Sequence, residues 1–151
     1  MIDALDREIM RRLQNDGRMS ATALAAEVGL TVAPCHRRLK ELEATGTISG
    51  YRAVIDPAAV GLGFEAMVFV TLERVDRPTV DEFEARVDGL VRITSAQRLF
   101  GDPDYVLKVV SEDLASYQRF FDDELTRLPG VRRVSSTLVM KNLKPAAGLP
   151  L

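Results

Sequence analysis

A short basic segment between residues 36 and 40 carries the clearest chemical signal in this sequence. It reads His, Arg, Arg, Leu, Lys, and no acidic residue follows before Glu41. Arginine can donate two parallel hydrogen bonds to the edge of a guanine base, and lysine neutralises phosphate as a point charge. The segment therefore indicates contact with nucleic acid, provided that its side chains share one face of a regular element.

Helical spacing predicts such a face. In a helix, side chains at i, i+3, i+4 and i+7 form one stripe, here opposite a buried face of Cys35, Leu39 and Leu42. Arg37 is the expected base-reading residue, and Arg38 lies on the flank, where a contact to backbone phosphate is expected. The stripe consists of Ala33, His36, Arg37 and Lys40, and the other expected phosphate contacts are Arg18, Thr31 and Arg52.

The overall charge of the chain does not support nucleic-acid binding by itself. The 151 residues carry a formal net charge of −2, and the pI is near 5.5. A role in binding DNA must therefore depend on local charge. The alternative is a solvated helix face, which is the usual fate of Arg and Lys, and the neighbouring elements decide between the two interpretations.

Three short helices are predicted around the basic segment. Asp3 and Ser20 are suited to cap the first two helices. The third helix runs from residue 31 to residue 45 and tolerates Pro34, because amides of the first turn have no intrahelical partner. The connection before it is tight and contains Gly29, which suits a left-handed helix end. This arrangement is typical of a helix-turn-helix.

The remainder of the chain predicts a second domain. Residues 47–56 suggest a short strand or ribbon, as in a winged-helix-like domain, and Pro57 opens a linker over residues 57–63. The βαββαβ order that follows is that of a ferredoxin-like sandwich, so the fold class is α+β, with a DNA-binding domain at 1–56 and a second domain at 64–151. The expected elements are strands 64–72, 91–100, 105–111 and 131–143 and helices 79–89 and 113–128.

Two of these strands are apolar on both faces. In the first, Met67 and Phe69 alternate with Ala66 and Val68, and strand 105–111 has the same character. Helices cover only one face of such a sheet, and the other apolar face needs a cover. The same face of a second copy is the simplest cover, which predicts a homodimer. Cover by the linker or the C-terminal tail is the alternative.

Composition excludes several other classes of protein. No apolar run approaches the roughly 18 residues of a membrane span, and the start of the chain does not resemble a signal peptide, so we expect a cytoplasmic protein without a membrane partner. The only cysteine, Cys35, and the only histidine, His36, are too few for a structural zinc site, and no metal or cofactor is expected. These adjacent helical residues point about 100° apart, so they form no catalytic dyad. Cys35 is expected to be a small buried hydrophobe.

Motifs along nearly the whole chain resemble those of one family. The N-terminal part contains Leu5-Asp6-Arg7, Asp16-Gly17-Arg18, Val28-Gly29-Leu30 and the run from Cys35 to Glu43, and the C-terminal part contains Gly101-Asp102-Pro103-Asp104-Tyr105 and Leu128-Pro129-Gly130-Val131. In order and spacing they resemble the Lrp/AsnC family of leucine-responsive and asparagine-operon regulators. The resemblance implies a dimer, often an octamer, that binds double-stranded DNA at a roughly palindromic site and regulates transcription in response to amino acids. Pro103 departs from the family, which more often has an aromatic or other non-proline residue there.

The same resemblance implies a site for an amino-acid effector. In the family this pocket lies at the contact between dimers and uses a loop, the end of the strand before it and the last strand. Loop carboxylates can meet the ammonium group of a zwitterion, and Arg98 is the expected partner of its carboxylate. A plain hairpin turn and a divalent-cation site are the alternatives. The corresponding positions are Arg98, Gly101, Asp102, Asp104 and Thr137.

Three other functions are compatible with the predicted domains. Siroheme decarboxylases share the two-domain plan, but the only histidine here lies on the helix expected to face DNA, and we expect no enzyme. RNA recognition motifs share the βαββαβ order but stack bases on aromatic residues of the third strand. That strand here reads Tyr105, Val106, Leu107, Lys108, Val109 and lacks the signature. An amino-acid sensor without DNA binding would leave the first three helices unexplained.

Overall fold

The computed structural model describes residues 2–144 and 148–151. The chain forms two compact units. The helical unit extends from the start of the chain to Val54 and includes Leu143–Leu151, and the sheet unit comprises Ile55–Asn142. None of the helices in the described ranges has the length and apolar character needed to cross a bilayer.

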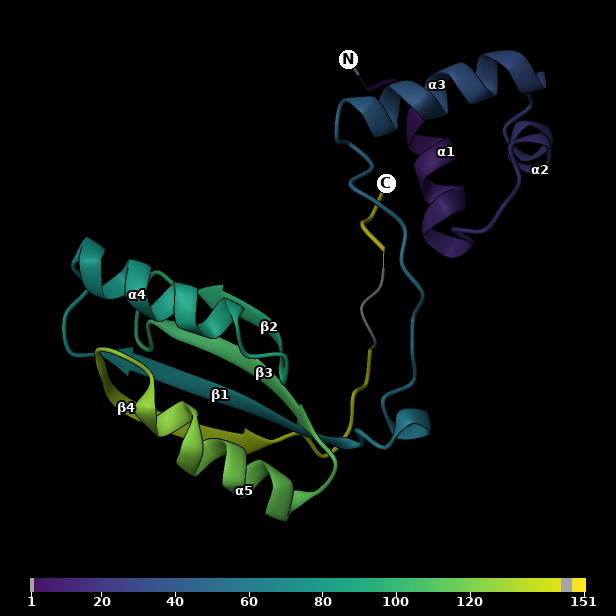
Figure 1. The fold of residues 1–151 in the computed structure, drawn as a ribbon. Helices are drawn as coiled ribbons and strands as arrows, with labels where there is room; N and C mark the ends of the chain where they lie inside the picture. The colour runs from purple at the N-terminus through teal and green to yellow at the C-terminus, as the bar shows by residue number, and fades with distance from the viewer. Residues whose placement is uncertain (1, 145–147) are drawn as a thin grey trace. The chain divides into compact units, whose positions relative to one another are not determined.

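The helical unit contains the three predicted helices, α1 (Ala4–Asn15), α2 (Ala21–Glu27) and α3 (Val32–Ala44) (Figure 1). Asp3 caps α1: its side chain accepts from the amide of Asp6 while the Asp6 side chain accepts from the amide of Asp3. These reciprocal bonds satisfy two of the donors that a helix start leaves without partners. Both the helices and the cap of α1 agree with the prediction.

A small apolar core holds these helices together. Ile9, Leu24 and Cys35, one from each helix, are 0% exposed. Gly29 ends α2 with φ of 68°, a left-handed conformation that glycine adopts without a steric cost. Cys35 is therefore the buried hydrophobe that the sequence predicted, and burial raises the pKa of its thiol.

Residues 47–56 do not form the predicted strand. Ile48 packs against the helical core, and its amide donates to the carbonyl of Leu42 at 3.0 Å. Beyond it the chain is extended and open, with Val54 97% exposed. A strand needs a neighbouring strand for its backbone hydrogen bonds, and within the described residues nothing pairs with this segment. The helix-turn-helix is thus present without the winged-helix-like ribbon.

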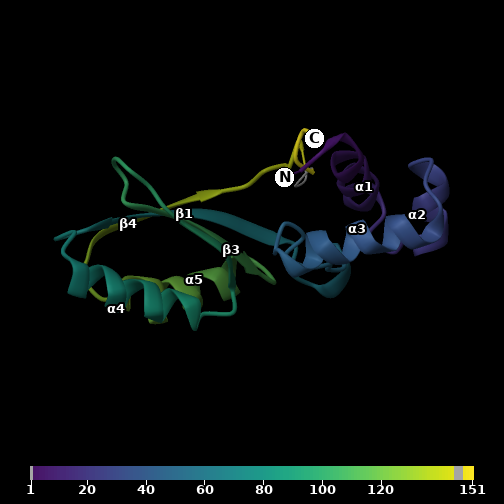
Figure 2. The same ribbon diagram turned by 90° about the horizontal axis from the view of Figure 1, so that it is seen from above.

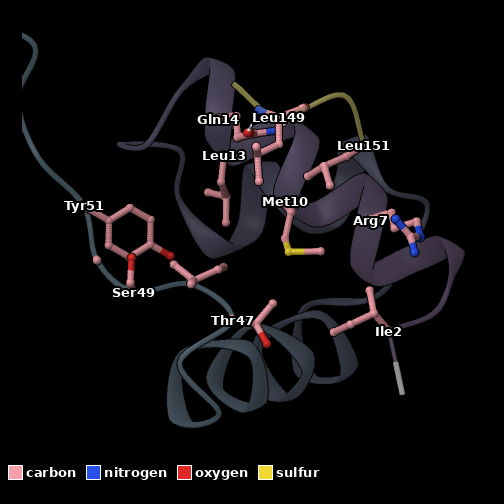
Figure 3. Close-up of a pocket in the computed structure, with 12 residues that line it drawn as sticks. Ile2, Arg7, Met10, Leu13, Gln14, Thr47, Ser49, Tyr51, Leu149 and Leu151 are labelled. Carbon is pink, nitrogen blue, oxygen red and sulfur yellow. Dashed lines mark hydrogen bonds between the residues drawn. The ribbon is translucent and has the colours of Figure 1, made fainter. Parts of the chain in front are cut away.

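The C-terminal segment also differs from the predicted division of domains. Leu143–Leu151 belongs with the helical unit rather than with a domain spanning 64–151. The Gln14 side chain exchanges two hydrogen bonds with the backbone of Leu149 (Figure 3). The Arg11 guanidinium donates to the carbonyl of Leu151. Gln14, Leu149 and Leu151 border an open apolar pocket of about 440 Å³ whose lining also includes Met10 and Leu13.

The sheet unit has the predicted ferredoxin-like topology. Its four strands are ordered β2-β3-β1-β4, and all neighbouring pairs are antiparallel. Both helices cover the same face of the sheet (Figure 2). The elements are β1 (Phe64–Leu72), α4 (Arg77–Asp88), β2 (Ile93–Arg98), β3 (Tyr105–Ser111), α5 (Leu114–Asp123) and β4 (Val131–Leu138).

Some element bounds differ from the prediction for local reasons. The helix expected at 79–89 begins at Arg77, because the Asp76 carboxylate accepts from the amide of Thr79 at 3.0 Å and caps the helix there. The helix expected at 113–128 ends at Asp123 and is followed by a 3-10 turn, Leu125–Arg127. The strand expected at 131–143 ends at Leu138, and that at 91–100 is limited to Ile93–Arg98. The predicted linker contains a short 3-10 turn, Ala58–Val60.

The two faces of the sheet have different surroundings. On the helix-covered face, Val68 and Leu107 are 0% exposed and pack in one cluster with Phe83 of α4. On the other face Met67 and Phe69 are half-buried. An ion pair between Lys108 and Glu65, at 3.0 Å, also lies on this second face, opposite the helices. The second face is therefore apolar at its centre and interrupted by one charge pair.

Candidate functional site

The predicted stripe lies on one exposed face of α3. Ala33, His36, Arg37 and Lys40 are all exposed, whereas Cys35 on the opposite side of the helix is buried. Within the described residues, no hydrogen bond or ion pair holds the Arg37 guanidinium. The face is therefore available to an outside partner.

Lys40 differs from Arg37 because it has an acidic neighbour. Its ammonium donates to the carboxylate of Glu43 at 3.1 Å, one turn along α3, and the Tyr51 hydroxyl donates to the same carboxylate at 3.1 Å. The bond from Lys40 is the largest cause of the lowered pKa of Glu43. Burial, followed by this carboxylate, raises the pKa of Tyr51. Glu43 thus weakens the positive charge that Lys40 presents.

The other expected phosphate contacts lie at two separate places. Thr31 is the residue before α3, and its side chain makes no capping hydrogen bond. Arg18 and Arg52 are exposed and line one open pocket of about 540 Å³, together with Gly17 and Tyr51. Two arginines from segments far apart in the sequence therefore border the same hollow of the helical unit.

Arg38 has a position that the sequence analysis did not foresee. One terminal nitrogen, Nη1, donates to a carboxylate oxygen of Asp3 at 2.7 Å and to one of Asp6 at 2.8 Å. Both acids belong to the start of α1, so the contact joins α1 to α3. The signal in the sequence is the acidic pair Asp3 and Asp6, of which the sequence analysis assigns a role only to Asp3, as a helix cap.

The β2–β3 loop, residues 99–104, is held by its own predicted site residues. The carboxylate of Asp104 accepts from the amide of Leu72 at 2.7 Å, and that of Asp102 accepts from the hydroxyl of Thr71 at 3.4 Å. The bond between Asp102 and Pro103 is cis, and Gly101 has φ of 152°. One oxygen of each aspartate is thus already engaged at the end of β1.

An open pocket of about 520 Å³ lies beside this loop. Its lining brings together three predicted residues, Arg98, Gly101 and Asp104. It also contains three apolar residues that the sequence analysis did not single out, and Phe100 among them is fully exposed. These residues are Val75, Leu99 and Phe100.

Thr137 is not brought to this pocket within one chain. It pairs with Met67 on β1, whereas the loop contacts β1 between Val70 and Leu72. Three to five residues of strand separate Met67 from these contacts, which is roughly 10 to 16 Å at about 3.3 Å per residue. Thr137 could therefore join the loop only from another copy of the chain.

Arg98 has an acidic neighbour in its own chain. Its guanidinium lies 3.9 Å from the carboxylate of Glu84 on α4, and the Tyr105 hydroxyl donates to that carboxylate at 2.8 Å. Burial and, second, the Glu84 bond raise the pKa of Tyr105 to about 12. Half of the Arg98 side chain is exposed, so it can still face a ligand. Across the described ranges, no group of three or more His, Cys, Asp or Glu side chains is placed to hold a metal ion.

Both units match known protein families. The AsnC-type helix-turn-helix domain matches residues 2–43, and the Lrp/AsnC ligand binding domain matches residues 65–149. A leucine-responsive regulatory protein from Rhizobium meliloti is 37% identical over 96% of this chain and 93% of its own length. A Bkd operon transcriptional regulator from Pseudomonas aeruginosa is 36% identical over 99% of this chain and 98% of its own.

Solved structures agree with these matches. A transcriptional regulator from Neisseria meningitidis, in complex with L-methionine, is 33% identical with a TM-score of 0.94, over 99% of this chain and 97% of its own. An AsnC family transcriptional regulator from Agrobacterium tumefaciens is 32% identical with a TM-score of 0.92, over 98% of this chain and 96% of its own. Together with the two domain matches, these likenesses show that the chain belongs to the Lrp/AsnC family of transcriptional regulators.

Proposed function

We propose that this regulator reads a roughly palindromic DNA site through the exposed face of α3 and that a small amino acid modulates its binding. Arg37 is the principal base-reading residue, and His36, Ala33 and Lys40 line the same contact. Arg18, Thr31 and Arg52 contact phosphates and fix the register of the protein on the duplex. Siroheme-type decarboxylation has no support from the residues that line the pockets described above.

The observation that carries this proposal is the state of the α3 face. An exposed arginine with no partner in the described parts of its own chain retains all its donors for a guanine edge or a phosphate. The buried residue Cys35 on the other side fixes which face of the helix points outward. The basic stripe of this acidic chain is thus a defined surface that can contact particular bases, rather than a diffuse positive charge.

A second copy of the chain completes the DNA-binding form. Met67, Phe69 and Val106 form an apolar centre on the uncovered face of the sheet, flanked by the Lys108–Glu65 pair. A twofold axis would place this face against itself, so that each copy covers the other. Two copies of α3 would then read two half-sites spaced by whole turns of the duplex. Larger assemblies, up to an octamer, bring further copies of the β2–β3 loop together.

The proposed effector binds beside the β2–β3 loop. Arg98 pairs with the ligand carboxylate, and the second oxygens of Asp102 and Asp104 accept from its ammonium group. Val75, Leu99 and Phe100 offer apolar surface to the ligand side chain, which favours an apolar amino acid. Thr137 enters this site from a neighbouring copy, so ligand binding and assembly state depend on each other.

Selection of bound fragments from genomic DNA, followed by footprinting, tests the DNA-binding function. The expected result is a protected region with two related half-sites, about 10 base pairs or a multiple apart. Protection of every fragment to the same extent, with no preferred sequence, would contradict sequence-specific reading.

Isothermal titration tests the effector function. L-methionine and L-leucine are titrated separately into the wild-type protein, into Arg98→Gln and into the matched control Arg119→Gln, whose exposed side chain lies on α5. We expect heat with wild type and Arg119→Gln and at least tenfold weaker binding to Arg98→Gln, because a charge-assisted bond is lost. Equal affinity for all three proteins would remove Arg98 from the site.

A further inference from the structure

We infer that Arg38 is a positioning residue that holds α3 against the start of α1 through Asp3 and Asp6, and that it makes no contact with DNA. This inference rests on the proposed DNA-binding function. It assigns Arg38 a different role from that of Arg37, although the two residues are adjacent in the basic segment.

The two carboxylates beside Arg38 have a donor at every oxygen. Nη1 of Arg38 donates to Asp3 Oδ2 at 2.7 Å and to Asp6 Oδ1 at 2.8 Å. The two remaining carboxylate oxygens are used in the helix cap: Asp3 Oδ1 accepts from the amide of Asp6 at 2.9 Å, and Asp6 Oδ2 accepts from the amide of Asp3 at 3.1 Å. All four oxygens thus have a donor, and Arg38 supplies two of these bonds.

Burial and charge keep the guanidinium in this place. The Asp6 side chain is only 12% exposed and that of Arg38 is 29% exposed, so solvent screens their attraction less than it would on an open surface. The pKa of Asp3 is lowered, mainly by the amide of Asp6 and then by Arg38. The pKa of Arg38 is raised by Asp6 and then by Asp3. Asp3 and Arg38 therefore each favour the ionised form of the other.

A phosphate contact through Nη1 would require this network of hydrogen bonds to open, and Nε or Nη2 would have to approach a phosphate from beside two carboxylates. Adjacent residues on a helix point about 100° apart, so Arg37 faces outward while Arg38 faces α1. Moving Arg38 to a phosphate would leave Asp6 largely buried without its cation, which is costly. The two aspartates would also repel the phosphate itself. On this flank of α3 the local charge therefore does not favour DNA.

The junction also explains why a charged contact is needed there. Asp6, Arg38, Leu42 and Thr45 line a hollow of about 240 Å³ at this end of the α1–α3 contact. Apolar packing is incomplete at such a hollow, so the guanidinium bridge fixes the orientation of α3 relative to α1. Reading base edges requires that the position of α3 be fixed to within a fraction of an ångström, because hydrogen bonds weaken steeply with misalignment.

The test compares three variants, Arg38→Gln, Asp6→Asn and the double substitution, on a selected operator and on unrelated DNA over a range of salt concentrations. For a positioning residue, we expect both single variants to lower the ratio of specific to unspecific affinity by roughly tenfold. The double variant should be no worse than either, because both remove the same contact. The affinity for unrelated DNA should stay as in wild type. The slope of log K against log salt concentration, called the salt slope, should also stay as in wild type.

A phosphate contact predicts opposite results. Arg38→Gln would then weaken binding to all DNA and reduce the salt slope by about one ion, and Asp6→Asn would tighten binding by releasing Arg38. Either result overturns the inference. If Arg38→Gln does not fold at the assay temperature, as judged by circular dichroism, the direction of the Asp6→Asn effect still decides. Failure of wild type to prefer any DNA sequence would instead refute the proposed function, and the inference with it.

Discussion

The exposed face of α3 and the β2–β3 loop were both predicted to be binding sites because of their charged residues, but their charges have different roles. On α3, Arg37 has no partner within the described residues. In the loop, Asp104 is bonded to the backbone of Leu72 and Asp102 to the side chain of Thr71. The helix face presents its charge outward, whereas the loop uses half of its carboxylate capacity to maintain its own shape.

This difference shows how much can be inferred from a charged residue in each setting. A regular helix assigns a direction to every side chain, so residue type and spacing together predict which charges are available. A loop has no such periodicity, and short polar side chains often satisfy its own backbone. If the two regions differ in this way, substitutions on α3 should change DNA binding, and substitutions in the loop should also change stability. The substitutions below run from the largest expected effect to the smallest.

Substitution of Arg37 should have the largest effect on DNA binding. Arg37→Ala is expected to cost about 1 to 3 kcal/mol per half-site and to relax the sequence preference there, because a bidentate contact to a base is lost. Fluorescence anisotropy titration on a selected operator measures the loss. Arg119→Ala, an exposed arginine on α5, serves as the control and should bind like wild type. Unchanged affinity of Arg37→Ala would mean that the α3 face is no more than a solvated surface.

Substitution of Asp104 should affect stability as well as ligand binding. Asp104→Ala removes a charge-assisted bond to the partly buried amide of Leu72, so we expect the sheet unit to lose about 1.5 to 3 kcal/mol of unfolding free energy. Urea unfolding followed by circular dichroism measures the change. In Asp102→Ala, where the bond is 3.4 Å long and exposed, the loss should stay within about 0.5 kcal/mol. Equal losses for the two variants would contradict the structural role of Asp104.

Substitutions of Lys40 and Glu43 should have the smallest effects on DNA binding, with opposite signs. Lys40→Gln should reduce the slope of log K against log salt by about 0.9 per protomer with little change in sequence preference. Glu43→Gln should tighten DNA binding slightly, because it releases Lys40 from its 3.1 Å contact. Binding titrations at four or more salt concentrations measure both. Weaker binding of Glu43→Gln would indicate that Glu43 orients Lys40 rather than competing for it.

The helix-turn-helix and the strands β1 and β3 could be predicted because their signals are local. Asp3 and Ser20 cap helices through bonds to residues three positions away, and Gly29 marks the helix end that it forms. Strands β1 and β3 have the predicted bounds because the apolar pattern and the turn residues at their ends agree. The α3 stripe follows from the period of the helix alone.

The features that the sequence did not predict have a common cause, because they depend on contacts between different elements. Residues 47–56 have a strand-like composition, but composition does not supply the partner strand that a ladder requires. Thr137 was grouped with the loop residues by resemblance; its register opposite Met67 separates it from them within one chain, so its place in the site stays a prediction that needs a second copy. The apolar residues of the loop pocket, such as Phe100, could have been noticed as large exposed hydrophobes only once their exposure was known.

The sequence by itself determined the three helices of the helical unit, the βαββαβ order of the sheet unit, which face of α3 is polar and which family the motifs resemble. These properties depend on residues within about four positions of each other, or on patterns repeated along one element. Only the tertiary structure decided that Arg38 binds Asp3 and Asp6, that Asp104 binds the amide of Leu72, and that Leu149 lies on Gln14. These contacts join residues 35, 32, 32 and 135 positions apart in the chain, and no local pattern encodes such a pairing.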